Sequence, residues 1–194
     1  MPDKYLRKDE IPAQESGPTT TGFNGDDLIQ VPEAPIPVAS SRAGGLPPTP
    51  AQVASGRQAR VEGVKQEFAR LTLGMFVASF SAYPLAFTYA GEAESPQGKA
   101  DAIDVKGPTD LMMRLFIHRE THLPLMISWQ TPPGRGQAAP TEHRVYYADY
   151  RDVSGVRFPF RIRLAVGPDT VEETTIDRYR VNVNVDPKKF EVRK

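Results

Sequence analysis

Hydrophobic and polar residues follow two different periods along the chain, and the change falls near Pro84. Before this residue, apolar side chains recur every three or four positions, which is the spacing of one face of an α-helix. After it, apolar and polar residues alternate in short runs that are separated by turn-forming residues, a pattern typical of β-strands. The pattern therefore predicts one main helix followed by a series of strands.

The helix is predicted over about residues 49–78. Thr49, Pro50 and Gln52 have the spacing of an N-cap, a first-position proline and a capping box. The stripe covers few heptads and has no basic face, so packing on a sheet is favoured over a coiled coil or a membrane-surface helix. The apolar stripe expected to face that sheet consists of Val61, Val64, Phe68, Leu71 and Met75.

Seven segments after Pro84 show the two-residue period of a strand. The connections between them are too short for the crossover that parallel neighbours need, so adjacent strands must be antiparallel. The predicted fold class is α+β, with a curved, unclosed antiparallel sheet and one main amphipathic helix packed on it. The segments are AFTYAGEAES, KADAIDVKG, DLMMRLFIH, PLMISWQ, EHRVYYADY, VRFPFRIRLAV and VEETTIDRYRVNV.

The first 48 residues are predicted to contribute strands and then a loop. KYLRKDEI can form a strand, and Asn24-Gly25 is a strong hairpin signal. Prolines are frequent in 31–48, and a proline cannot donate a hydrogen bond to a sheet. We expect a single domain in which 1–30 supplies N-terminal strands and a hairpin of the sheet, 31–48 is a Pro/Gly-rich loop, and 49–194 forms the helix and the meander.

The segments LMMRLFIH and PLMISW carry apolar residues on both faces. Leu111 and Met113 alternate with Met112 and Phe116, so neither face of this strand is consistently polar. One explanation is an ordinary core, and the other is a sheet that is covered by a helix on one side and curled around an apolar hollow on the other. Methionines suit such a hollow because their side chains adapt to varied shapes. The pattern leaves both explanations open.

Composition excludes several classes of function. Lys+Arg and Asp+Glu both number 24, so the net charge is zero and no overall field attracts nucleic acid. The absence of cysteine excludes disulfides, thiolate metal sites and cysteine nucleophiles. No run approaches the roughly 20 apolar residues of a membrane span, and the start MPDKYLRKDEIPAQ lacks the apolar region of an export signal. If Met1 is the natural start, a cytoplasmic location is expected.

The three histidines are the main candidates for a metal site. His118 and His122 lie in HRETH, whereas the zinc-protease motif places its glutamate directly after the first histidine and lies on a helix. The two-residue period on either side predicts that HRETH is a turn between strands. A three-histidine site would also need His143, so we expect no metal and no cofactor. Asp149 and the pair Glu172-Glu173 form no catalytic arrangement; pairing of the glutamates with Arg161 or Arg163 is the simpler account, and no enzymatic activity is expected.

Several segments resemble LolA/LolB-like envelope proteins, in particular acidobacterial-type relatives of the outer-membrane lipoprotein-sorting proteins. They are TYAGEAESPQGKADAIDVKGP, RLFIHRETHLPLMISW and YYADYRDVSGVRFPFRIRL, together with TTTGFNGDDLIQ and the strand that runs into VNVNVDPKKFEV. The resemblance implies the distal part of an unclosed half-barrel, with an apolar interior suited to acyl chains and a location in the periplasm or cell envelope. Members of that family begin with an export signal and further strands, whereas PDKYLR resembles a point already inside the domain. We therefore expect either a fragment of a longer protein or a chain whose exposed sheet edge is covered by another chain.

Two functions follow as hypotheses. The first is a non-enzymatic cell-envelope protein that binds an apolar ligand, such as a lipid or a lipoprotein acyl chain, in the half-barrel. The alternative is an accessory subunit of an envelope complex, with a partner chain covering an open sheet edge at the N-terminal strands. The candidates for lining the interior, or for packing its core, are Phe87, Tyr89, Met113, Leu115, Ile127, Trp129, Tyr147, Phe158, Phe160 and Ile162.

Overall fold

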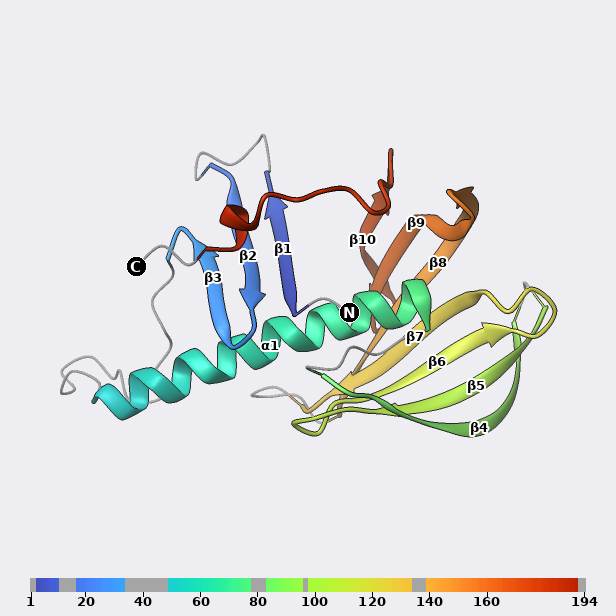
Figure 1. The fold of residues 1–194 in the computed structure, drawn as a ribbon. Helices are drawn as coiled ribbons and strands as arrows, with labels where there is room; N and C mark the ends of the chain where they lie inside the picture. Colours follow the sequence, from blue (N-terminus) through green and yellow to red (C-terminus); the bar gives the residue numbers. More distant parts are fainter. Residues whose placement is uncertain are drawn as a thin grey trace. The chain divides into compact units, whose positions relative to one another are not determined.

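The computed structural model contains two antiparallel sheets and one long helix (Figure 1). It describes residues 3–10, 17–33, 49–77, 83–95, 98–133 and 139–191. The α+β class, the antiparallel pairing and the single long helix are confirmed within these ranges. The predicted loop at 31–48 lies outside the described residues from position 34 onward.

The first sheet has the strand order β1-β2-β3, and the second has the order β10-β9-β8-β7-β6-β5-β4. The chain forms two compact units: α1 passes from the first to the second between Phe68 and Ala69, and the C-terminal segment from Val185 onward belongs to the first. The elements are β1 (Lys4–Asp9), β2 (Thr19–Asn24), β3 (Asp27–Val31), α1 (Pro50–Phe76), β4 (Ala86–Ser95), β5 (Gly98–Lys106), β6 (Met112–His118), β7 (Pro124–Thr131), β8 (Thr141–Val153), β9 (Val156–Val166), β10 (Asp169–Thr175) and the 3-10 helix η1 (Pro187–Phe190).

The N-terminal strands form a sheet of their own, although we expected them in the same sheet as the meander. The predicted hairpin is present, with β2 and β3 joined at Gly25, whose φ of 59° is the left-handed conformation that glycine adopts readily. Among the described residues, β1, β2 and β3 pair only with one another. Alternation shows that a segment can be a strand, but it does not show which edge the strand joins.

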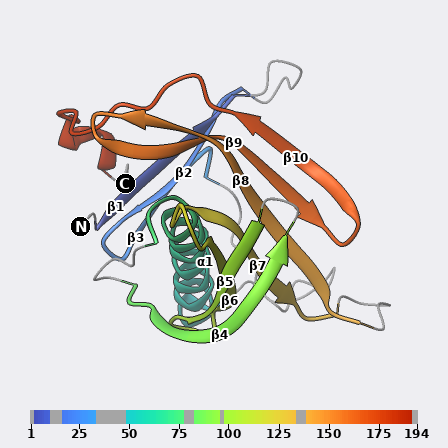
Figure 2. The same ribbon diagram turned by 90° about the vertical axis from the view of Figure 1, so that its right-hand side faces the viewer.

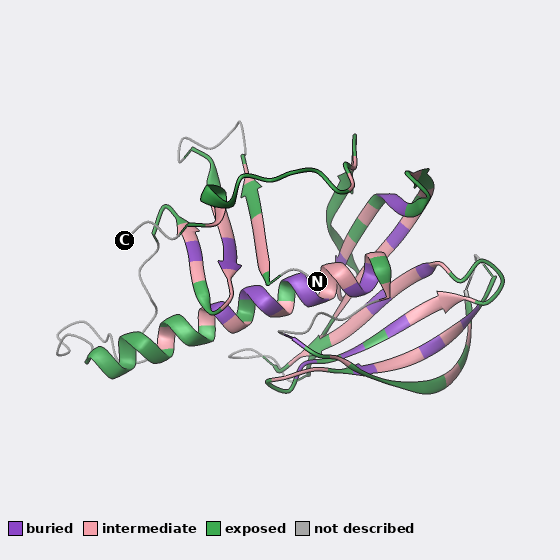
Figure 3. Ribbon diagram, in the orientation of Figure 1, coloured by how far each residue is buried: buried purple, intermediate pink, exposed green. Residues whose placement is uncertain are grey.

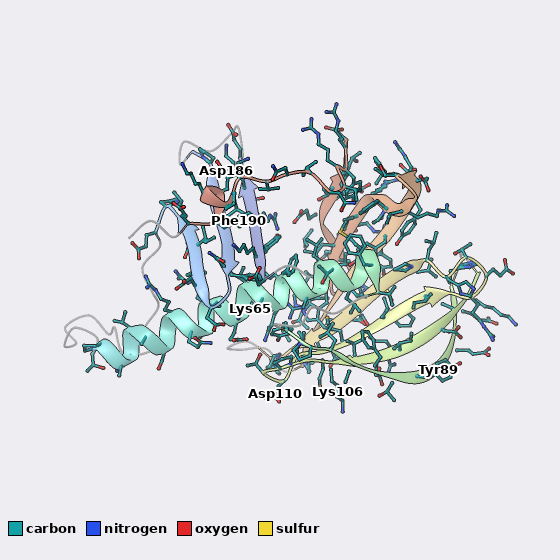
Figure 4. The ribbon with its side chains drawn as sticks, viewed as in Figure 1. Lys65, Tyr89, Lys106, Asp110, Asp186 and Phe190 are labelled. Atoms are coloured by element: carbon teal, nitrogen blue, oxygen red, sulfur yellow. The ribbon has the colours of Figure 1, made fainter. Side chains whose placement is uncertain are left out.

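The first unit has an aromatic core between this sheet and α1. Phe23 lies 5.6 Å from Phe68 and 6.1 Å from Tyr5, measured between ring centroids. Lys65, which is labelled in Figure 4, is only 4% exposed. Its Nζ donates a 2.7 Å hydrogen bond to Oδ1 of Asp26. A buried ammonium requires such a partner, because an unpaired charge in the core is strongly destabilising.

The start of α1 agrees with the predicted capping box. The Thr49 amide donates to Gln52 Oε1 at 2.8 Å, and the Gln52 amide donates to Thr49 Oγ1 at 3.3 Å. The two side chains therefore satisfy backbone groups that a helix start leaves without a partner. The helix ends at Phe76, and Val77 has a φ of 52°, which stops the right-handed helix before the predicted end near 78.

The buried face of α1 agrees with the predicted stripe only in its first half. Val61, Val64 and Phe68 are buried, but Leu71 and Met75 are only partly buried. The buried positions after Phe68 are Ala69, Leu73 and Gly74. Figure 3 shows that the first turns of the helix are exposed and that burial begins near its middle. Ala69 and Gly74 are too small to carry a clear hydrophobic signal, whereas Leu73 is a large apolar residue that the predicted stripe missed because it followed Leu71 and Met75 instead.

The second unit is a strongly bent sheet of seven strands (Figures 1 and 2). Each strand pairs with its neighbour in the chain, so the sheet is the predicted meander. The last predicted strand is shorter than expected, because β10 ends at Thr175 and residues 176–180 have no regular structure. The Ile176 amide still donates a hydrogen bond to the Phe160 carbonyl at 2.9 Å. Tyr179 lies beyond the end of the strand, and its ring packs against Phe158.

Candidate functional site

All ten candidate residues lie on one face of the seven-stranded sheet, which we call the apolar face. Residues paired directly across antiparallel strands point to the same side, so the register assigns the face. Phe87 pairs with Val105, which pairs with Met113, and Tyr89 is linked in the same way through Ile103 to Leu115. The next strands continue the same face, because Leu115 pairs with Ile127 and Ile127 pairs with Val145. Alternation along β7 and β8 then adds Trp129, which pairs with His143, and Tyr147, which pairs with Ile162. Alternation along β9 from Ile162 adds Phe160 and Phe158.

The last turns of α1 cover one end of the apolar face. Gly74 approaches Tyr147 so closely that a Cβ built on it would lie 1.9 Å from the Tyr147 hydroxyl oxygen. Phe76 meets Phe158 edge-on, with ring centroids 5.4 Å apart. These contacts bury the aromatic residues of β8 and β9, and burial raises the pKa of Tyr147 well above its ordinary value.

The segment that follows β10 also packs on the apolar face, against the aromatic residues of β9. The Tyr179 ring stacks on Phe158 with centroids 4.4 Å apart and meets Phe160 edge-on at 5.2 Å. Its hydroxyl donates a 2.6 Å hydrogen bond to the Pro159 carbonyl. Partial burial raises the pKa of Tyr179 to about 12. Sequence reasoning did not include Tyr179, because we read its segment as a strand.

Arg70 is a further residue of this covered end that the sequence pattern did not identify. Its guanidinium carbon lies 4.7 Å from the centre of the Trp129 ring, and His143 stacks on the same tryptophan with centroids 5.2 Å apart. His143 Nε2 is 3.1 Å from Thr131 Oγ1. An arginine counts as polar in a periodicity argument, so only the fold shows that it packs on an aromatic ring.

The other end of the apolar face, at β4, is exposed. Phe87 and Tyr89 are 43% and 61% exposed, whereas Leu115 and Ile127, two and three strands away from β4, are 0% and 1% exposed. Figure 4 labels Tyr89 on β4. The candidate set therefore divides into six buried residues, which pack the core, two partly buried residues, Trp129 and Ile162, and the aromatic pair Phe87 and Tyr89 on the surface.

The opposite face of the same sheet is charged and partly apolar. Arg114 pairs with Asp104, with Nε and Oδ1 2.7 Å apart, and this hydrogen bond lowers the pKa of Asp104. Arg161 pairs with Glu173, which confirms the expected cross-strand pairing. The guanidinium carbon of Arg163 lies 4.5 Å from the centre of the Tyr146 ring. Apolar side chains on this face, such as Met126, are only partly buried, so both faces contain apolar residues as the sequence indicated.

The HRETH segment forms the predicted turn. His118 is the last residue of β6, and β7 begins at Pro124. The Nδ1 atom of His118 accepts hydrogen bonds from the amides of Glu120 and Thr121, both at 3.2 Å. The ring therefore holds the turn. Within the described ranges, no three His, Cys, Asp or Glu side chains gather closely enough to hold a metal ion.

Asp149, weighed above as an acid/base candidate, is part of a surface ion pair. It forms two hydrogen bonds with Arg151, one of them 3.1 Å between Nε and Oδ1, and this pairing lowers the pKa of the carboxyl group. The guanidinium carbon of Arg151 also lies 4.4 Å from the centre of the Phe160 ring. A carboxylate held in its ionised form by an exposed arginine has the features of a structural pair rather than of a general base.

Comparisons with protein-family models, with curated proteins and with solved structures found no match. None of the helical residues that the structure describes forms a segment long and apolar enough to cross a membrane.

Proposed function

We propose that this chain is a non-enzymatic protein that binds an apolar ligand, such as a lipid or a lipoprotein acyl chain, at the exposed end of the apolar face. The observation that carries the proposal is the pair Phe87 and Tyr89, which are 43% and 61% exposed, whereas the other eight candidates on the same face are buried or partly buried. An exposed aromatic pair at the end of an apolar surface gives a hydrocarbon chain continuous contact with both rings.

The binding site that we propose runs from β4 toward β5. Ile103 lies between Tyr89 and Leu115 in the register and is only partly buried, so an acyl chain lying across β4 would contact it after the two aromatic rings. Leu115 and Ile127, which pair directly across β6 and β7, are 0% and 1% exposed, and this limits the site to the outer strands. The resemblance to LolA/LolB-like proteins supports the acyl-chain class and suggests a location in the periplasm or cell envelope.

The test is a titration of the intact chain with a fluorescent fatty acid. Saturable binding is expected, and replacing both Phe87 and Tyr89 by alanine should weaken it by about tenfold or more, since burying one large apolar side chain is worth about 1.5–3 kcal/mol. Met112→Ala is the matched control, because Met112 is 63% exposed at the same end of the sheet but its position in the register puts it on the opposite face. No binding above background would overturn the proposal.

The alternative function, an accessory subunit of an envelope complex, is favoured by the edge of the three-stranded sheet. Val31 is 46% exposed at the end of β3, and among the described residues β3 pairs only with β2. A partner chain could extend this sheet through backbone hydrogen bonds. Purification from the native source in a stoichiometric complex would support this function, and a Val31→Lys variant that still assembles would argue against the edge as the contact.

A further inference from the structure

The outer edge of β4 differs from the other sheet edges in the described part of the chain. Its five residues from Ala86 to Ala90 are all exposed, and none of them carries a charge. Among the described residues β4 pairs only with β5, so every second residue directs its backbone N–H and C=O away from the sheet. Figures 1 and 2 show β4 as an outermost strand.

The other edge strands have features that discourage strand addition. β10 carries Asp169, Glu172 and Glu173 and has a bulge between Thr170 and Glu172. β1 contains four charged residues among six; β3 carries one charge, Asp27, and is only five residues long, which limits but does not prevent pairing with a different chain. Charges, bulges and short length are the usual means by which an edge strand avoids pairing with another chain. From Ala86 to Tyr89, β4 has neither a charge nor a bulge, and its own bulge lies between Tyr89 and Gly91.

The sequence of this edge is complementary to itself in the antiparallel direction. If Thr88 of one copy faces Thr88 of another, Phe87 faces Tyr89 on both sides of the two-fold axis, and these positions lie before the bulge between Tyr89 and Gly91. Aromatic cross-strand pairs of this kind are stabilising. Glu92 and Glu94 lie beyond the bulge and outside this regular stretch. The zero net charge also removes any long-range repulsion between two copies.

We propose that β4 binds β4 of a second copy of this chain, antiparallel and centred on Thr88, so that the two seven-stranded sheets become continuous. The partner is a second copy because the contact is isologous: the same residues, Phe87 to Tyr89, supply both halves of it. The proposal rests on the edge strand alone and is independent of ligand binding.

The first test is sedimentation velocity of the full chain over a wide range of concentration. We expect a monomer–dimer equilibrium. Thr88→Lys and Thr88→Glu should each raise the dimer dissociation constant by at least about fivefold, because each places like charges opposite each other at the axis. An equimolar mixture of the two variants should restore a dimer. Met112→Lys adds a charge at an exposed position away from the axis and should leave the equilibrium unchanged.

The second test uses the absence of cysteine in the natural chain. Residues directly opposite each other in an antiparallel pair lie within the Cα separation that a disulfide requires. Thr88→Cys should therefore form a disulfide-linked dimer on mild oxidation, whereas Met112→Cys should not. A chain that stays monomeric at every concentration, or a dimer that Thr88→Lys does not weaken, would overturn the proposal. Loss of fatty-acid binding in a variant that still dimerises would instead count only against the proposed function.

Discussion

The two ends of the apolar face have the same residue pattern but different cover. At β8 and β9, Tyr147, Phe158 and Phe160 are 3%, 6% and 7% exposed under α1 and Tyr179. At β4, the pair Phe87 and Tyr89 has no comparable burial. A two-residue period therefore assigns a side chain to a face of the sheet, whereas its burial depends on which distant segment packs against that part of the face.

The largest effect is expected from truncation at the covered end. Tyr147→Ala should reduce the free energy of unfolding by about 3–5 kcal/mol, because it leaves a cavity under α1. The measurement is urea denaturation followed by circular dichroism. Tyr146→Ala is the control, since its side chain lies on the opposite face over Arg163 and should cost about 1 kcal/mol. Equal losses for the two variants would contradict the assigned cover.

Two glycines of α1 allow a sharper test of the same contact. Gly74→Ala should destabilise the protein by about 1–3 kcal/mol, because its methyl group would overlap the Tyr147 ring. Gly63→Ala meets nothing within 4 Å and should stabilise the helix by up to about 1 kcal/mol. Thermal unfolding of both variants measures the difference. If both changes stabilise the protein, Gly74 does not contact Tyr147.

The cation–π contact between Arg70 and Trp129 is expected to have a smaller effect. Arg70→Met keeps much of the side-chain length but removes the charge, and should cost about 0.5–2 kcal/mol. Trp129 is the single tryptophan, so its fluorescence emission should also shift. Arg163→Met removes the corresponding contact with Tyr146 and should leave the emission unchanged. An unchanged emission in Arg70→Met would mean that the guanidinium does not lie on the ring.

Alkaline pH should weaken the covered end. The pKa of Tyr179 is raised from 10.0 to about 12 because the hydroxyl is partly buried, and burial also raises the pKa of Tyr147. Above pH 10 the unfolded chain releases these protons first, so the unfolded state binds fewer protons and stability falls as the pH rises from 10 toward 12. Urea denaturation at several pH values should show this slope, and Tyr179→Phe should make it shallower. A slope identical to that of the natural chain would contradict the role of Tyr179.

The smallest effect on stability is expected at the exposed end. Tyr89→Ala should change the free energy of unfolding by less than about 0.5 kcal/mol, because the side chain is 61% exposed. The same urea denaturation used for Tyr147→Ala measures it, which gives a direct comparison between two tyrosines of one face. A loss close to that of Tyr147→Ala would show that another segment covers β4.

Much of the local structure could be predicted from short-range patterns. The Thr49–Gln52 capping box, the hairpin at Gly25, the HRETH turn and the exact bounds of β4 and β9 depend on residues within a few positions of one another. The grouping of the ten candidates on one face also followed, because alternation within each strand and short antiparallel connections leave few possible registers. The separate N-terminal sheet did not follow, since alternation does not identify the edge that a strand joins.

Short-range patterns were enough to predict the helix start, the strands of the meander, their antiparallel order and the sheet face on which their apolar residues lie. These features depend on backbone geometry and on neighbours in the chain, and both can be read from the order of residues. Only the tertiary structure decided that α1 buries Gly74 against Tyr147, that Arg70 packs on Trp129, and that Phe87 and Tyr89 stay exposed. The reason is that burial is decided by segments far apart in the chain, and no local pattern records which segments meet.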